Sequence, residues 1–347
     1  MRLQSGTSRY LLPGLTVGLL IASALALSWG ALSIPYSTLL NALGLPIGQP
    51  AQPFEITTLW HLRLPRLLLA IGVGAALAVA GTAMQGLVRN PLADPGLIGL
   101  SSGAALAASA VMVLGLALDL NPASTSRWVL PLAAFAGAGM SALLVLSLAQ
   151  YEGYTRVSTL LLAGLAINAV AGAGIGFLAN VADDRALRSV TFWMFGSLAR
   201  AGWSEIAIAL PLLMIPILAL PREAAALNAL LLGEAEAGHL GVDVERLKRR
   251  VMLLVILAVG VSVAVAGIIG FVGLIVPHLL RPQMGPDHRK LLPAAALGGA
   301  LLLTLGDTLS RSLLAPAELP IGILTALIGG PVFLLLLLRY RQSPELA

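Results

Sequence analysis

Apolar segments long enough to cross a bilayer recur along the whole chain, and they constrain its fold more than any other feature. In lipid the backbone must satisfy its own hydrogen bonds, so a run of about 20 apolar residues crosses as an α-helix. We therefore predict a single all-α, polytopic membrane domain over residues 1–347. Its ten transmembrane helices are expected at 11–33, 64–86, 94–117, 128–149, 157–180, 204–221, 250–268, 270–283, 291–313 and 319–339.

Two of these segments are unusual. The segment 270–283 is short for a full span, and we expect it to lie inside the bundle with a broken or re-entrant path. The segment 11–33 follows Arg2 and Arg9, a pattern that a cleaved signal peptide would share. Because it is long enough to span, we interpret it as a retained first helix.

Composition supports this class and excludes others. Only 11% of the residues are charged, against about 25% in soluble domains, and the mean hydropathy is +0.93. The chain has no cysteine, which excludes disulfides, thiolate metal sites and Cys nucleophiles. The formal net charge of the chain is +5. In a membrane protein such a charge usually reflects Lys and Arg in cytoplasmic loops, so we expect no nucleic-acid partner.

The positions of Lys and Arg predict the orientation of the helices. Cytoplasmic loops carry an excess of these residues. With the N-terminus inside, 14 of the 21 Lys and Arg residues fall in cytoplasmic segments. We therefore predict a multi-pass inner-membrane protein with both termini in the cytoplasm. The seven residues left on the outer side are Arg63, Arg66, Arg127, Arg185, Arg188, Arg200 and Arg311.

Three of these outer arginines lie at the ends of predicted helices. Arg63 and Arg66 flank Pro65 at the start of the second span, and Arg311 lies at the end of the ninth. Such residues can extend to lipid headgroups while their stems stay in the apolar layer. They can equally form a basic docking site for an acidic partner. The residue pattern leaves both interpretations open.

The most polar long segment, 222–250, separates the sixth and seventh spans. Its Ala, Leu and Glu residues predict a short helix over 223–232, and Gly233 should end it. A second short helix is expected over 234–240, before Gly241. Two such helices would form a cytoplasmic projection that fits a groove on another protein. An ordinary amphipathic connector at the membrane surface is the alternative.

Motifs for energy use and catalysis are missing. The only lysines, Lys248 and Lys290, lie outside any Gly-x4-Gly-Lys-Ser/Thr context, so the chain does not bind ATP in that way. The four histidines are scattered, so we predict no catalytic and no metal-binding residues. Asp307 is the one acid well inside an apolar run. It is consistent with a proton relay in an ion-coupled transporter, or with a structural acceptor of hydrogen bonds. A membrane protein with only an assembly role is a further alternative.

Four blocks of sequence resemble one family of membrane transporters. They are RLPRLLLAIGVGAALAVAGTAMQGLVRNPLADPGLIGLSSGAAL (63–106), LLLGEAEAGHLGVDVERLKRR (230–250), GFVGLIVPHLLRPQMGPDHRKLLPAAALGGALLLTLGDTLSR (270–311) and ELPIGILTALIGGPVFLLLL (318–337). In this order they resemble the FecCD family of ABC-importer permeases, which carry iron siderophores, haem or vitamin B12.

The resemblance implies a set of partners. It implies ten helices per subunit and a second copy of the chain around a central pathway. It also implies two cytoplasmic ABC subunits, which would bind ATP and Mg²⁺, and a periplasmic binding protein for haem or an iron chelate; this chain itself would hold no cofactor. The segment 223–240 resembles the coupling helices that contact the ATPase. Arg63, Arg66 and Arg311 match the arginines that dock the binding protein. The expected ATPase contact is Gly233, Glu234, Ala235, Glu236, Ala237, Gly238, His239, Leu240 and Gly241.

The substrate is suggested by the loop VADDRALRSVTFWMFGSLARAGW (181–203), which resembles the corresponding loop of haem permeases. We therefore expect haem as the transported substrate, with ferric siderophore and cobalamin as alternatives. Transport would occur by alternating access between two copies of 157–180. Arg185 and Arg188 could receive the haem propionates, or pair with Asp183 and Asp184. The expected pathway residues are Gly164, Asn168, Gly172, Gly176, Arg185 and Arg188.

Overall fold

The computed structural model describes residues 4–30, 32–42, 44–45, 50–117, 127–152, 154–315 and 317–342. Arg2 lies outside them. Ten helices of 13 to 25 residues within the described part of the chain each overlap one predicted span. They are α1 (Gln4–Ser28), α4 (Leu64–Val88), α5 (Leu100–Ala117), α6 (Val129–Ala149), α7 (Val157–Val181), α9 (Trp203–Ala219), α12 (Val244–Ala266), α13 (Val272–Met284), α14 (His288–Ser310) and α15 (Ile321–Gln342). The predicted all-α class is confirmed.

Length and hydropathy single out the helices that can cross a membrane. In the described part of the chain, 7 helical stretches are long and apolar enough to do so, and α5 and α15 contain shorter apolar helices. The helix α13 has only 13 residues. It follows non-helical backbone in which Gly267 and Phe271 have φ values of 69° and 67°. A short helix after irregular backbone is what the sequence predicted for this segment.

Short elements connect the long helices. Before α4 the chain forms α2 (Tyr36–Ala42), α3 (Pro53–Thr57) and the π-helical turn η1 (Thr58–Arg63), which runs directly into α4. The other connectors are η2 (Pro95–Ile98), β1 (Gln150–Tyr151), β2 (Tyr154–Thr155), α8 (Asp184–Met194), η3 (Leu220–Glu223), α10 (Ala224–Leu230) and α11 (Glu234–His239). The antiparallel hairpin β1–β2, which pairs Gln150 with Thr155, was not predicted.

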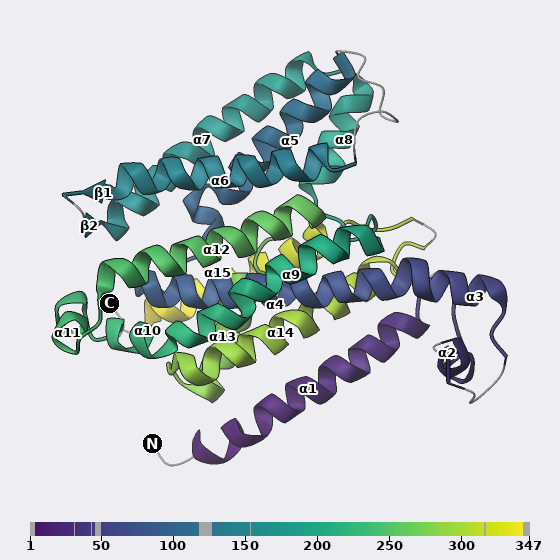
Figure 1. Cartoon of the computed structure of the whole chain (residues 1–347), viewed down its shortest axis with the longest axis horizontal. Helices are drawn as coiled ribbons and strands as arrows, with labels where there is room; N and C mark the ends of the chain where they lie inside the picture. Colours follow the sequence, from purple (N-terminus) through teal and green to yellow (C-terminus); the bar gives the residue numbers. More distant parts are fainter. Residues whose placement is uncertain are drawn as a thin grey trace.

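Helix α4 forms the centre of the bundle. In Figure 1 it runs through the middle of the molecule, and it packs against α9, α12, α13 and α14. In the most apolar 18-residue window of the helical stretch Pro53–Val88, which contains α4, 89% is buried inside the structure. Small residues allow this close approach, because a side chain at Gly74 would collide with the Gly299 carbonyl of α14. A side chain at Gly81 would likewise collide with Gly273 of α13.

Helices α5, α6 and α7 form a second group, with α8 at one end (Figure 1). This group joins the rest of the bundle chiefly where α6 and α5 pack against α12. Helix α7 packs on α5, α6 and η2. Only 17% of its most apolar 18-residue window is buried inside the structure. Its exposed side chains include Leu162, Leu165, Val170 and Phe177. Within the described chain, α7 therefore presents an apolar face that nothing covers.

Candidate functional site

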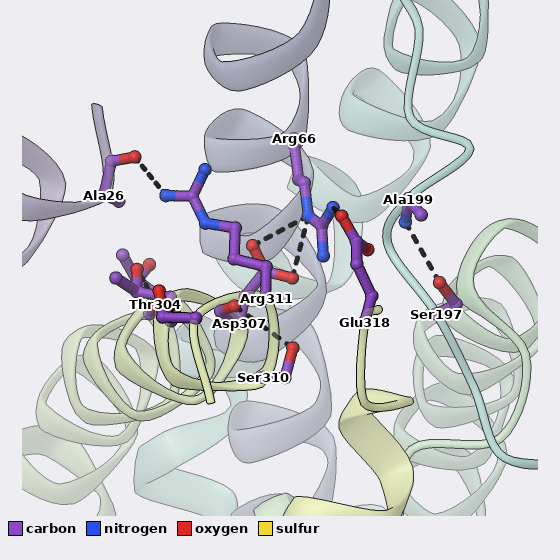
Figure 2. A network of polar contacts seen from close by, with 11 residues as sticks. Ala26, Arg66, Ser197, Ala199, Thr304, Asp307, Ser310, Arg311 and Glu318 are labelled. Atoms are coloured by element: carbon purple, nitrogen blue, oxygen red, sulfur yellow. Dashed lines mark hydrogen bonds and ion pairs between the residues drawn. The ribbon is translucent and has the colours of Figure 1, made fainter. Parts of the chain in front are cut away.

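An arginine cluster lies where α4 begins and α14 ends. Its centre is Arg66, which is 9% exposed. Arg66 Nε donates to both carboxylate oxygens of Asp307, at 3.0 and 2.9 Å, and Nη1 donates to both oxygens of Glu318, at 3.0 and 2.9 Å. Figure 2 shows Arg66 held between the two acids. Asp307 therefore accepts hydrogen bonds from a neighbouring helix, as the structural interpretation of this residue predicted.

The other two arginines of the cluster bind the end of α1. Arg63 donates to the carbonyl oxygens of Leu27, in the last turn of α1, and of Leu32, just after the helix. Arg311 donates to the Ala26 carbonyl in the same last turn (Figure 2). The last carbonyls of a helix have no partner within the helix and carry partial negative charge, which favours a cation there. The Nε atom of Arg311 is buried and has no partner among the described residues.

A cavity of about 340 Å³ opens onto this cluster. Its lining includes Arg63, Arg66, Arg311, Glu318 and Leu62. Three arginines face only two carboxylates, so the cluster keeps an excess of positive charge. The arginines themselves are only 5–9% exposed. A partner carboxylate would have to enter the cavity to reach them, and docking at these residues remains a prediction.

At the opposite end of the bundle, the segment 222–250 forms the two expected short helices (Figure 1). Gly233 separates α10 from α11 with a φ of 124°, and Gly241 follows α11 with a φ of 85°, conformations that side chains disfavour. Within α11 only Ala237 is buried. Leu232 and Leu240 are each 65% exposed beside it. The segment thus presents a surface with exposed leucines.

Asn228 joins helix α10 to the start of α14 by hydrogen bonds. Its amide donates to Asp287 Oδ1 at 2.6 Å, and its Oδ1 accepts the backbone N–H of His288 at 2.9 Å. Burial would raise the pKa of the Asp287 carboxyl. The hydrogen bonds from Asn228 and Arg289, with the charges of Arg289 and Lys290, outweigh this and hold that pKa below its ordinary value.

The structure divides the predicted pathway residues of α7 into two sets. Gly164 lies against the Leu97 carbonyl of η2, where a side chain would collide. Asn168 contacts Ser102 of α5 and the Gly96 carbonyl. These two residues pack inside the subunit, so the structure does not bring them to the exposed face. Gly172 and Gly176 have open space around them and do lie on that face.

Arg185 and Arg188 lie on α8, where both are exposed. Asp183 caps this helix by accepting the Ala186 N–H at 2.7 Å. In the described residues neither arginine forms an ion pair with Asp183 or Asp184. A cavity of about 590 Å³ is lined by Arg188, Arg200, Phe192, Trp193 and Glu318, among other residues. Ala199 and Glu318 line this cavity and the one at the arginine cluster, so the two adjoin. Arg200 was assigned to the outer side from the sequence, but neither Arg200 nor Glu318 was among the predicted site residues.

Within the described residues, seven helical stretches of membrane-spanning length, the shorter helices packed with them and polar clusters at the two ends of the bundle define a multi-pass membrane protein. The chain belongs to the FecCD transport family, whose model matches residues 18–339. It is therefore an ABC-importer permease of the FecCD type.

Individual relatives match along almost the whole chain. A hemin transport system permease protein of Yersinia pestis is 45% identical over 96% of this chain and 97% of its own length. A cobalamin import system permease protein of Halobacterium salinarum is 43% identical over 90% of this chain and 79% of its own length. A solved structure of a metal-chelate type ABC transporter in an inward-facing conformation has a TM-score of 0.82 at 33% identity. It covers 95% of this chain and 99% of its own.

Proposed function

We propose that this chain is the permease subunit of a haem importer. The observation that carries the proposal is the 45% identity to the hemin permease, which extends over 96% of this chain. The cavity beside α8 agrees with it, because Arg188 and Arg200 can bind carboxylates while Phe192 and Trp193 suit a flat apolar ring. The cobalamin permease at 43% identity makes cobalamin the main alternative, beside ferric siderophores.

The arginine cluster is the proposed docking site for a periplasmic binding protein. Its excess positive charge and the cavity of about 340 Å³ favour an acidic side chain that enters from the partner. This assignment places the cluster on the outer side of the inner membrane, and α10, α11 and both termini in the cytoplasm. The excess of Lys and Arg in the segments then assigned to the cytoplasm supports that orientation.

Two further contacts complete the proposed importer. The exposed surface of α11, with Leu232 and Leu240, would contact a partner ABC subunit that binds ATP and Mg²⁺. The apolar face of α7, with Gly172 and Gly176, would face a second copy of the chain, and the pathway would run between the two. Small residues on this face allow close helix approach. Alternating access would then open the pathway to one side at a time.

Substrate uptake by reconstituted vesicles tests this function. Proteoliposomes would contain this chain, its ATPase and its binding protein, with ATP inside and haem, a ferric siderophore or cobalamin outside. ATP-dependent uptake of haem alone is the expected result. Uptake of another chelate would overturn the substrate assignment, and uptake without the ATPase would overturn the importer assignment.

A further inference from the structure

A buried lysine lies at the α11 end of the bundle, in the second turn of α12. Lys248 is 2% exposed. Its Nζ donates to the Thr155 carbonyl at 2.9 Å, to Glu234 Oε2 at 2.8 Å and to Glu245 Oε1 at 3.0 Å. An ammonium group has three donors, and here all three have an acceptor. We call Lys248, Glu234, Glu245 and Thr155 the lysine cluster.

The three acceptors come from three different segments. Glu234 is the first residue of α11, Glu245 lies in α12, and Thr155 ends the hairpin β1–β2. The second oxygen of Glu245 closes the cluster, because it accepts both the N–H and the hydroxyl of Thr155, each at 3.0 Å. Lys248 therefore joins the proposed ATPase contact to the hairpin by hydrogen bonds through a single side chain.

The hairpin leads directly into the helix with the uncovered face. Helix α7 begins at Val157, two residues after Thr155. The N–H of Arg156, the N-cap of α7, bonds to the carbonyl of Ala149, the last residue of α6, so this bond closes the hairpin between the two helices. Along its own length α7 packs on α5, α6 and η2. The lysine cluster is thus a direct polar connection from α11 to the start of α7.

Stability alone gives no reason for a lysine at this position. Taking the Lys248 ammonium and the Glu245 carboxylate largely out of water costs free energy that their attraction only roughly offsets, and well-packed apolar side chains often do as well or better. A satisfied buried cluster does, however, fix the geometry of the segments it joins, since every donor and acceptor has a preferred direction. A connection that transmits movement from a contact surface to a helix requires such fixed positions of the segments.

We propose that Lys248 is a positioning residue that transmits movement of α11 to the start of α7, and so couples the ATPase to the transport pathway. The proposal rests on the proposed function of α11 and α7. It assigns to the lysine cluster a role in energy coupling, distinct from substrate binding and from docking of the binding protein.

The first test replaces Lys248 by Met in the complete importer. Uptake and ATP hydrolysis are measured together in proteoliposomes. Lys248→Met is expected to lower the substrate moved per ATP by about tenfold, a usual size for coupling between two sites. Arg246→Met is the matched control, because Arg246 lies on the same helix, is 65% exposed and pairs only locally with Asp243 at 3.3 Å. It should leave the ratio unchanged.

A second variant covers the case in which Lys248→Met does not fold. Glu245→Gln alters only the hairpin arm of the cluster, at a side chain that is 17% exposed and lies outside the proposed ATPase contact. Hydrogen exchange is measured with and without nucleotide on peptides covering 234–241 and 150–160. In the wild type, nucleotide should change protection in both peptides. In Glu245→Gln the change should persist at 234–241 and be lost at 150–160.

The outcomes separate this inference from the proposed function. If wild-type vesicles show no ATP-dependent uptake, the proposed function fails. If the wild type transports and both variants keep its uptake per ATP and its nucleotide response at 150–160, the role of the lysine cluster is overturned. A variant that loses assembly and hydrolysis together, with the ratio intact, would also overturn it, because that result describes a structural role.

Discussion

The arginine cluster and the lysine cluster both contain buried cations beside carboxylates, but they differ in how completely their groups are paired. In the lysine cluster every donor of Lys248 has an acceptor, and Glu245 also binds the backbone of Thr155. In the arginine cluster three cations face two carboxylates, and Arg311 Nε has no partner in the described residues. A cavity of about 340 Å³ opens onto it.

This difference in pairing indicates that the two clusters have different functions. A complete cluster holds segments of one chain at fixed distances, so it suits the transmission of movement. An incomplete cluster with excess charge and an open cavity suits a partner that supplies the missing acceptor. The two ends of the bundle would then differ in function because they differ in charge balance.

The largest expected effect comes from breaking the paired part of the arginine cluster. Asp307→Ala leaves Arg66 buried with Glu318 alone, and we expect a loss of about 3 kcal/mol in the free energy of unfolding. Thermal unfolding of the purified chain measures it. Arg127→Ala is the control, because Arg127 is 66% exposed and lies 3.8 Å from Glu205, and its loss should cost below about 1 kcal/mol. Equal shifts for both variants would contradict the account.

The unpaired part of the same cluster should respond differently. Arg311→Gln removes a positive charge that forms no ion pair in the described residues, together with a hydrogen bond to the Ala26 carbonyl, so we expect a cost of about 1 kcal/mol, less than for Asp307→Ala. Docking should weaken, and we expect the half-saturating concentration of binding protein to rise by about tenfold. The dependence of uptake on binding-protein concentration measures this. An unchanged half-saturating concentration would remove Arg311 from the docking site.

Replacing Glu318 should strengthen docking of the binding protein, opposite to the effect of Arg311→Gln. It already holds Arg66 Nη1, so it competes with any partner carboxylate for that group. Its side chain is 43% exposed, so its removal should disturb the fold little. Glu318→Gln should tighten capture of the binding protein by roughly threefold, the size expected for a partly exposed ion pair. Weaker capture would show that Glu318 itself contributes to docking.

The smallest effect is expected at Asp287, on the connection between α10 and α14. Its depressed pKa contributes stability that is present above the ordinary pKa of an Asp and is lost as the pH falls through the folded value. Asn228→Ala removes one cause of the depression, so the acid loss should be smaller and should be complete at a higher pH, while its onset near the ordinary pKa of an Asp stays the same. Thermal unfolding followed from neutral to acidic pH tests this, and identical profiles would contradict it.

The sequence predicted the helices well and the clusters only in part. Apolar length located all ten long helices, and glycine located the break between α10 and α11, because both are local properties of the chain. Arg66 and Glu318 stand 252 positions apart, and Lys248 and Thr155 stand 93 apart. Pairings over such separations depend on packing, which no local pattern records. The spacing of Glu245 and Lys248 was the one visible signal of the lysine cluster.

The glycines of α7 show the same limit. Gly164 and Gly172 look alike in the sequence, yet one packs against η2 and the other lies on the exposed face. The hairpin β1–β2 was missed because its strands have only two residues each and carry no periodic pattern.

The most direct test measures uptake per ATP as a function of binding-protein concentration, in Arg311→Gln and Lys248→Met importers beside the wild type. The account predicts that Arg311→Gln raises the half-saturating concentration and leaves uptake per ATP unchanged. It predicts that Lys248→Met lowers uptake per ATP and leaves the half-saturating concentration unchanged. If both variants shift the same quantity, the arginine cluster and the lysine cluster do not have the separate functions of docking and coupling.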